Sequence, residues 1–235
     1  MTRSAIIVAH GQPSDPAPAE AEIAALAAKV AAHLPGWTVR SATLAQPGAL
    51  DRAVAGLEAP LVFPFFMADG WFIRTAMPDR LARASAKTPL LMTPFGLLPE
   101  ALALAAETAT AAAASRGWAV AETTLILAAH GSGRSPHPRE AAELTAKAIG
   151  ETSTFAAIRC GFIEEEPEIA DVAGGTDNRA LCLPLFVARW GHVETDLPAA
   201  LAKARFAGAL LEPLGTAPEV PGIIARALTA AMPSG

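Results

Sequence analysis

The chain alternates short apolar runs with longer segments in which apolar residues recur every three or four positions. Runs of the first kind predict buried strands, and segments of the second kind predict amphipathic helices. In the first half, the predicted strands are residues 6–9, 37–44, 60–67 and 90–93, and the predicted helices are residues 19–33, 49–57, 79–85 and 99–115. A regular alternation of strand and helix predicts a parallel sheet with helices on both of its faces.

The second half of the chain repeats the first. His10 and His130 each end a buried apolar run, and they are 120 residues apart. Pro184 and Pro198 follow Pro64 and Pro78 at the same spacing, and the same offset matches residues 42–47 with residues 162–167. We therefore predict an α/β protein of two similar lobes, residues 1–117 and 118–235, each a four-stranded parallel sheet flanked by helices. A cleft between two lobes is the expected place for a ligand.

Candidate metal ligands follow three strands of the second repeat. These ligands are His130, Glu164 and His192. In open α/β sheets, ligands bind beyond the carboxyl ends of the strands, and two imidazoles with a carboxylate suit a borderline divalent transition metal. The first repeat keeps only His10, because residues 71–74 read WFIR where residues 191–194 read GHVE. The second repeat is therefore expected to hold the metal site and the first a degenerate copy.

Each candidate also has a simpler interpretation. Either imidazole could be a structural histidine, and His10 could be a relic of the duplication. Glu164 lies in an acidic run of the kind that usually forms a solvated surface, and its neighbour Glu165 competes for the same role. Glu194 and Asp196 could cap or flank the helix that begins near residue 198, where acidic side chains favour the helix dipole.

Composition narrows the class of protein. An apolar fraction of 52% supports a sizeable core, and a net charge of −5 without a basic run argues against nucleic-acid or anionic membrane partners. Cys160 and Cys182 are too few for a disulfide framework. We expect a cytoplasmic protein, since neither a signal peptide nor a long apolar span is visible. No organic cofactor is expected, because the glycine-rich phosphate-binding motifs are missing.

These motifs resemble those of the class II tetrapyrrole chelatases, the sirohydrochlorin cobaltochelatases and ferrochelatases of the CbiX, SirB and CbiK type. The resemblance is carried by AAHGS at residues 128–132, FIEEEP at residues 162–167 and the segment from Pro184 to Pro198 that contains GHVETDLP. It implies a lyase-class chelatase in which His130, His192 and Glu164 bind the metal and act in catalysis. Many two-lobed CbiX or SirB members carry the complete site in the N-terminal half, whereas this chain carries it in the C-terminal half.

The resemblance also implies the reaction and its partners. A divalent metal, Co²⁺ or Fe²⁺, would be inserted as a substrate into sirohydrochlorin or a related tetrapyrrole, for cobalamin or siroheme biosynthesis. The alternative is a non-catalytic carrier of tetrapyrrole or metal that uses the same cleft. Because the macrocycle is rich in carboxylates, its candidate contacts are Arg134, Arg189, Arg74 and, as an imidazole, His10. A monomer is expected, since two fused lobes remove the need for a dimer.

Overall fold

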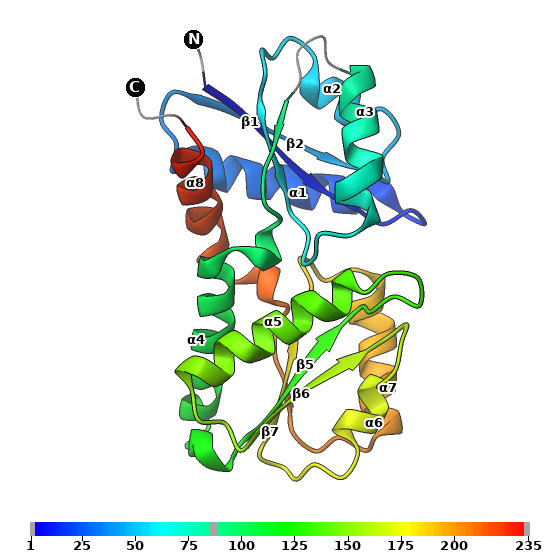
Figure 1. The fold of residues 1–235 in the computed structure, drawn as a ribbon, viewed down its shortest axis with the longest axis vertical. Helices are drawn as coiled ribbons and strands as arrows, with labels where there is room; N and C mark the ends of the chain where they lie inside the picture. The colour runs from blue at the N-terminus through cyan, green and yellow to red at the C-terminus, as the bar shows by residue number, and fades with distance from the viewer. Residues whose placement is uncertain (1–2, 85–88, 233–235) are drawn as a thin grey trace. The chain divides into compact units, whose positions relative to one another are not determined.

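The computed structural model describes residues 3–84 and 89–232, which form two four-stranded parallel sheets (Figure 1). The first sheet has the order β2-β1-β3-β4, and the second has the equivalent order β6-β5-β7-β8. The strands of the first sheet are β1 (Arg3–Ala9), β2 (Trp37–Thr43), β3 (Leu61–Pro64) and β4 (Leu90–Leu91). Those of the second are β5 (Thr124–Ala129), β6 (Ala157–Phe162), β7 (Ala180–Pro184) and β8 (Ala209–Leu210). The predicted fold class is confirmed.

The first sheet is covered by helices on both faces. One face packs against α2 (Ala49–Val54) and α3 (Met77–Ala84), and the other against α1 (Pro16–Ala32) and α8 (Val220–Ala230). On the first of these faces, Ile6 and Val8 of β1 lie in one core cluster with Leu50 of α2 and Met77 of α3. Because side chains alternate along a strand, the buried Ile7 faces the opposite layer. The central strand is therefore buried on both sides, as its continuous apolar run predicts.

The second sheet has the same layers. Helices α4 (Pro99–Ser115) and α5 (His137–Thr152) lie on one face, and α6 (Ile169–Ala173) and α7 (Leu197–Lys203) lie on the other (Figure 1). Ile126 of β5 lies in a core cluster with Ile169 of α6 and Leu201 of α7. Within the described residues, no helix is long and apolar enough to cross a membrane.

The compact units of the structure differ from the predicted division after residue 117. The first unit joins the residues up to Phe95 with those from Pro218 onward, and the second spans Gly96–Ala217. Helix α4 packs on β7 and α5, whereas α8 packs on α1 and β3. The two helices that end the repeats are thus exchanged between the units. A periodic sequence marks the repeated segment, but it does not determine which of two similar sheets buries the last helix.

The strand register also corrects the alignment of the two repeats. Ala9 pairs with Thr43, and its counterpart Ala129 pairs with Phe162, so Phe162 corresponds to Thr43 and not to residue 42. Six residues, 163–168, connect β6 to α6, whereas five, 44–48, connect β2 to α2. The longer connection contains the acidic run of the second repeat. The loop after β6 is therefore one residue longer than its counterpart after β2, and the two are not equivalent residue by residue.

Candidate functional site

His130 stands at the carboxyl end of β5, where Gly131 turns the chain. Gly131 has a φ of 73°, and a Cβ atom at this position would lie 2.8 Å from Phe162 Cβ. The turn therefore requires glycine, both for its left-handed backbone and for the close approach of β6. His130 Nδ1 lies 2.9 Å from the carbonyl oxygen of Gly131. A carbonyl can only accept, so Nδ1 carries the proton and Nε2 is left with a free lone pair.

His192 begins a π-helical turn, His192–Asp196, between β7 and α7. Such turns are rare, and they occur frequently at functional sites. The Nδ1 atom of His192 lies 2.7 Å from Asp196 Oδ2, and a carboxylate in this position accepts a hydrogen bond from the Nδ1–H group. The Asp196 side chain makes no capping hydrogen bond to α7, so the expected capping role is replaced by orientation of His192. The four-residue spacing of His192 and Asp196 is the signal in the sequence that points to this contact.

The two imidazoles meet through their Nε2 atoms, which are 3.1 Å apart. Their rings are perpendicular, with centroids 4.5 Å apart. With both Nδ1–H groups donating hydrogen bonds to other partners, the two Nε2 atoms carry no proton, and a cation bound to both would stabilise their close approach. Imidazole nitrogens lie about 2.1 Å from a divalent transition metal, and a separation of 3.1 Å would then subtend an angle of about 95° at the ion. The pair therefore has the geometry of two neighbouring ligands of one metal.

Glu164 and Glu165, adjacent in sequence, face different partners. Glu164 Oε1 lies 3.8 Å from His130 Nε2, and the Glu164 side chain is 54% exposed. Glu165 is only 14% exposed, and its carboxylate accepts hydrogen bonds from the Ser132 amide and from Arg139. Of these two carboxylates, Glu164 is therefore the one beside the imidazoles.

The centre is open to solvent. The His130 and His192 side chains are 40% and 46% exposed. Across residues 3–84 and 89–232, no group of three or more His, Cys, Asp or Glu side chains is placed so that it could hold a metal ion, so Glu164 does not complete a three-ligand site with the two histidines in this structure. An ion bound by the two Nε2 atoms, with the Glu164 carboxylate nearby, would keep most of its coordination positions accessible to another ligand.

The first unit keeps the backbone and the first imidazole of this centre but lacks the second imidazole and its carboxylate partner. His10 Nδ1 donates to the carbonyl oxygen of Gly11 at 3.0 Å, as His130 does to its own neighbour. A π-helical turn, Phe72–Ala76, again follows the third strand. Its first residue contributes a phenyl ring that meets His10 edge-on at 4.4 Å and 87°. Phe72 thus takes the place of the second imidazole, and Ala76 takes the place of the carboxylate that orients it.

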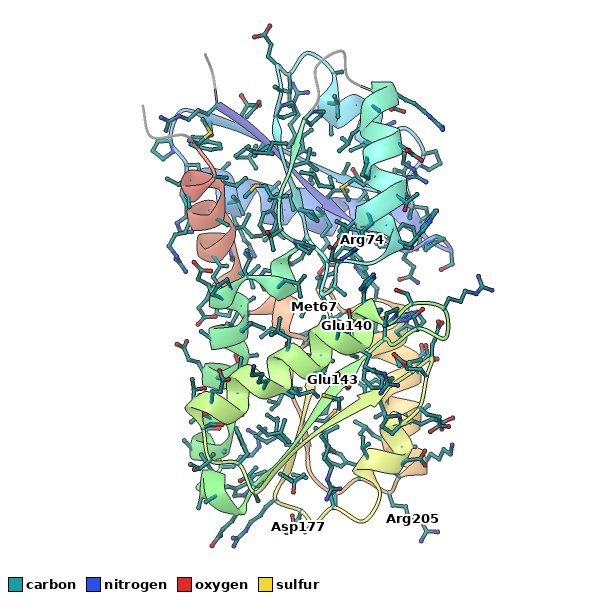
Figure 2. The ribbon with its side chains drawn as sticks, in the orientation of Figure 1. Met67, Arg74, Glu140, Glu143, Asp177 and Arg205 are labelled. Atoms are coloured by element: carbon teal, nitrogen blue, oxygen red, sulfur yellow. The ribbon has the colours of Figure 1, made fainter. Side chains whose placement is uncertain are left out.

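The candidate substrate arginines lie on exposed loops and turns. Arg134 and Arg189 follow β5 and β7 of the second unit, and Arg189 forms an ion pair with Glu212. Arg74 lies on the π-helical turn of the first unit (Figure 2). It forms an ion pair with Asp69 at 3.1 Å. In the second unit, the loops after β5 and β7 therefore supply two guanidinium groups as well as the two histidines.

Comparisons with known proteins identify the family. The CbiX family profile matches residues 124–231. The solved structure of a CbiX described as the terminal enzyme for siroheme biosynthesis in denitrifying bacteria has 50% identity and a TM-score of 0.91, covering 98% of this chain and 100% of that one.

Two more distant structures share the fold. SirB from Bacillus subtilis, solved with Fe³⁺, has 15% identity and a TM-score of 0.76, covering 97% of this chain and 95% of that one. A multi-domain protein of Deinococcus radiodurans with structural similarity to chelatases has 21% identity and a TM-score of 0.73, covering 98% of this chain and 54% of that one. A search of curated proteins gave no match. Because it is 50% identical to a CbiX in a match that covers 98% of this chain and all of the other, this chain belongs to the CbiX family of class II tetrapyrrole chelatases.

Proposed function

We propose that this protein inserts a divalent metal, with Fe²⁺ preferred over Co²⁺, into sirohydrochlorin. The reaction replaces two pyrrole N–H protons by one M²⁺ and releases two protons. The observation that carries the proposal is the pair of imidazole Nε2 atoms that face each other at 3.1 Å. The relative that is 50% identical is described as the terminal enzyme for siroheme biosynthesis, and this supports the preference for iron, because siroheme is an iron tetrapyrrole.

The open ligand set suits a metal that must leave the protein. His130 and His192 bind the ion from one side through Nε2, while Gly131 O and Asp196 hold the rings in place. The remaining coordination positions are available to water and then to the pyrrole nitrogens of the macrocycle. A storage or carrier protein would be expected to enclose the ion with more ligands, so the open centre favours metal transfer over retention.

Proton transfer follows from the same geometry. When the ion moves to the macrocycle, two Nε2 lone pairs again face each other at hydrogen-bonding distance. One of the two nitrogens accepts a pyrrole proton and then donates a hydrogen bond through it to the other nitrogen. The pair therefore holds one of the two protons released. Glu164, which is 3.8 Å from His130 Nε2 and 54% exposed, passes protons between this pair and solvent.

An anaerobic insertion assay tests the proposal. Protein, sirohydrochlorin and Fe²⁺ or Co²⁺ are mixed, and the absorbance change of the macrocycle is compared with the spontaneous rate. His130→Ala and His192→Ala are each expected to lower the excess rate by about 100-fold, the lower range for loss of a positioned proton acceptor. His10→Ala is the matched control, because His10 has the same turn but contacts Phe72.

Three results would contradict parts of the proposal. A rate equal to the spontaneous one would refute chelatase activity, and stoichiometric binding without insertion would instead support a carrier. A larger kcat/KM with Co²⁺ than with Fe²⁺ would overturn the metal preference. An equal loss of rate in His10→Ala would contradict the assignment of the reaction to the second unit.

A further inference from the structure

Arg139 and Glu165 form an ion pair next to the His130 turn. Arg139 Nε and Nη2 donate to Glu165 Oε2 at 3.1 and 2.8 Å, and the Ser132 amide donates to Glu165 Oε1 at 3.1 Å. The two side chains are only 33% and 14% exposed. Two guanidinium N–H groups thus converge on one carboxylate oxygen, and charge-assisted hydrogen bonds are roughly twice as strong as those between neutral groups.

This pair joins three segments of the second unit. Through Ser132 it holds the turn that follows His130, and through a hydrogen bond from Arg139 Nη2 to the Glu166 carbonyl it holds the loop that contains Glu164. Arg139 itself lies in the first turn of α5, next to Glu140, and Glu143 follows one turn later (Figure 2). The Glu164 amide also donates to the His130 carbonyl at 2.9 Å. The relative positions of His130 and Glu164 therefore depend on this anchor.

The surroundings leave the pair little freedom to move. The Arg139 guanidinium carbon lies 4.7 Å from the centroid of the Phe162 ring, a cation–π contact. Glu165 Cγ would be 2.8 Å from a Cβ atom at residue 131, so the carboxylate side chain lies against a space that only glycine leaves open. The shape of the turn and the location of the carboxylate are thus coupled.

The first unit shows that the fold does not need this pair. There, Glu20 of α1 anchors the end of the edge strand, because its Oε2 accepts hydrogen bonds from the amide and the hydroxyl of Thr43, each at 2.7 Å. Thr43 is the register counterpart of Phe162. The five residues that follow it, LAQPG, contain no carboxylate. Since the unit without the imidazole pair folds the same turn in another way, the Arg–Glu pair is specific to the unit that carries the candidate metal site.

We propose that Arg139 and Glu165 are positioning residues that fix His130 and Glu164 in the geometry that binds the metal substrate. This inference rests on the proposed function, because the metal and the macrocycle are those of the chelatase reaction. Arg139 also occupies the Glu165 carboxylate and keeps it from acting as a further ligand. Groups that orient metal ligands typically contribute about 10–100-fold to metal affinity or activity. We expect effects of this size when either residue is replaced.

Anaerobic Co²⁺ titration of the full chain, followed by visible ligand-field absorption, provides the test. Glu165→Gln keeps the size of the side chain and removes its charge, and it is expected to raise the Kd for Co²⁺ and the KM for the metal by about 10–100-fold. The KM for sirohydrochlorin should change little, because neither residue is assigned to the macrocycle. Glu143→Gln is the matched control. Glu143 is another carboxylate near Arg139, at 4.0 Å and on the same helix, but its side chain is 58% exposed. Circular dichroism and urea unfolding establish that each variant is folded.

A double-mutant cycle shows whether the two residues act together. Because they act as one unit, Arg139→Ala with Glu165→Ala should weaken Co²⁺ binding no more than the larger of the two single changes. Arg139→Lys should bind Co²⁺ more tightly than Arg139→Ala but more weakly than wild type, since lysine keeps the positive charge and loses the planar guanidinium donors. A wild-type Kd and rate in Glu165→Gln, or fully additive losses in the double variant, would overturn the inference. Failure of the wild-type protein to bind Co²⁺ or to exceed the spontaneous insertion rate would instead refute the proposed function.

Discussion

Replacing Gly131 by alanine tests how tightly the histidine turn is held against β6. Gly131 has a φ of 73°, and the added Cβ atom would lie 2.8 Å from both Phe162 Cβ and Glu165 Cγ. Real Cβ atoms do not approach other carbons this closely, so the end of β6 or the turn has to move. The change therefore combines backbone strain with overpacking at a single atom.

The expected loss of stability is the net of three contributions. A left-handed backbone costs an L-residue roughly 1–2 kcal/mol. An added methyl group in a tightly packed site costs about 1–3 kcal/mol. The reduced freedom of the unfolded chain returns about 0.4–1 kcal/mol. We therefore expect Gly131→Ala to lower the free energy of unfolding by about 3 kcal/mol.

Urea unfolding at fixed pH measures this loss, and two glycines of the first unit supply the controls. Gly36 has a φ of 82° with no atom within 4 Å of an added Cβ, so Gly36→Ala isolates the strain, about 1 kcal/mol. Gly11 has a φ of 77° and a Cβ contact of 2.7 Å with Thr43 Cβ, so Gly11→Ala should cost as much as Gly131→Ala. Only Gly131→Ala should also weaken Co²⁺ binding, because only its turn carries an imidazole that is paired with a second one.

The reasoning is refuted if Gly131→Ala is no more destabilising than Gly36→Ala. That result would mean that the approach of Phe162 to the turn is not rigid. An equal loss of Co²⁺ affinity in Gly11→Ala would refute the claim that the two histidine turns differ in function.

Three further predictions concern the carboxylate beside His192, the degenerate turn of the first unit and a buried thiol. Asp196→Ala should raise the Kd for Co²⁺ by about 10–100-fold in an anaerobic titration, and an unchanged Kd would show that the carboxylate does not orient His192. Phe72→His combined with Ala76→Asp should create an additional Co²⁺ site beside His10, detected as an increase in binding stoichiometry, and an unchanged stoichiometry would contradict the equivalence of the two π-helical turns. Burial raises the pKa of the Cys182 thiol to about 12, whereas an unfolded thiol titrates at about 8.5. The unfolded chain therefore loses this proton first, and the free energy of unfolding should fall as pH rises from about 8.5 towards 12. Urea unfolding at pH 7.5 and at about 9.5 measures this decrease, which should be smaller in Cys182→Ala than in wild type. An equal decrease in both proteins would contradict its assignment to this thiol.

Strands and long helices were predictable because their patterns are local. The apolar runs before His10 and His130 are buried on both faces of a sheet, and a continuous apolar run requires no knowledge of the partner strand. Helix α1 begins three residues earlier than predicted, at Pro16. Proline is favourable in the first helical turn, so this helix extends beyond its periodic part.

The π-helical turns and the exchange of helices were not predictable in this way. A turn of five residues has no repeating pattern, so the segments that begin at Phe72 and His192 carry no periodic signal of their own. The destination of α4 depends on which sheet offers it an apolar face, and the two sheets are built from similar residues. The one-residue shift between the repeats became visible only from the pairing of Thr43 and Phe162 with their neighbouring strands.

The sequence by itself determined that His130 and His192 lie at the same edge of one sheet. Parallel strands end at a common edge, and the duplication showed which repeat keeps both imidazoles. Only the tertiary structure decided how these residues are oriented: Asp196 holds His192, Glu164 lies beside His130, and Glu165 is held by Arg139 from another element. The physical reason is that strand periodicity fixes where a side chain leaves the backbone, whereas its direction and its partners depend on contacts between segments distant in sequence.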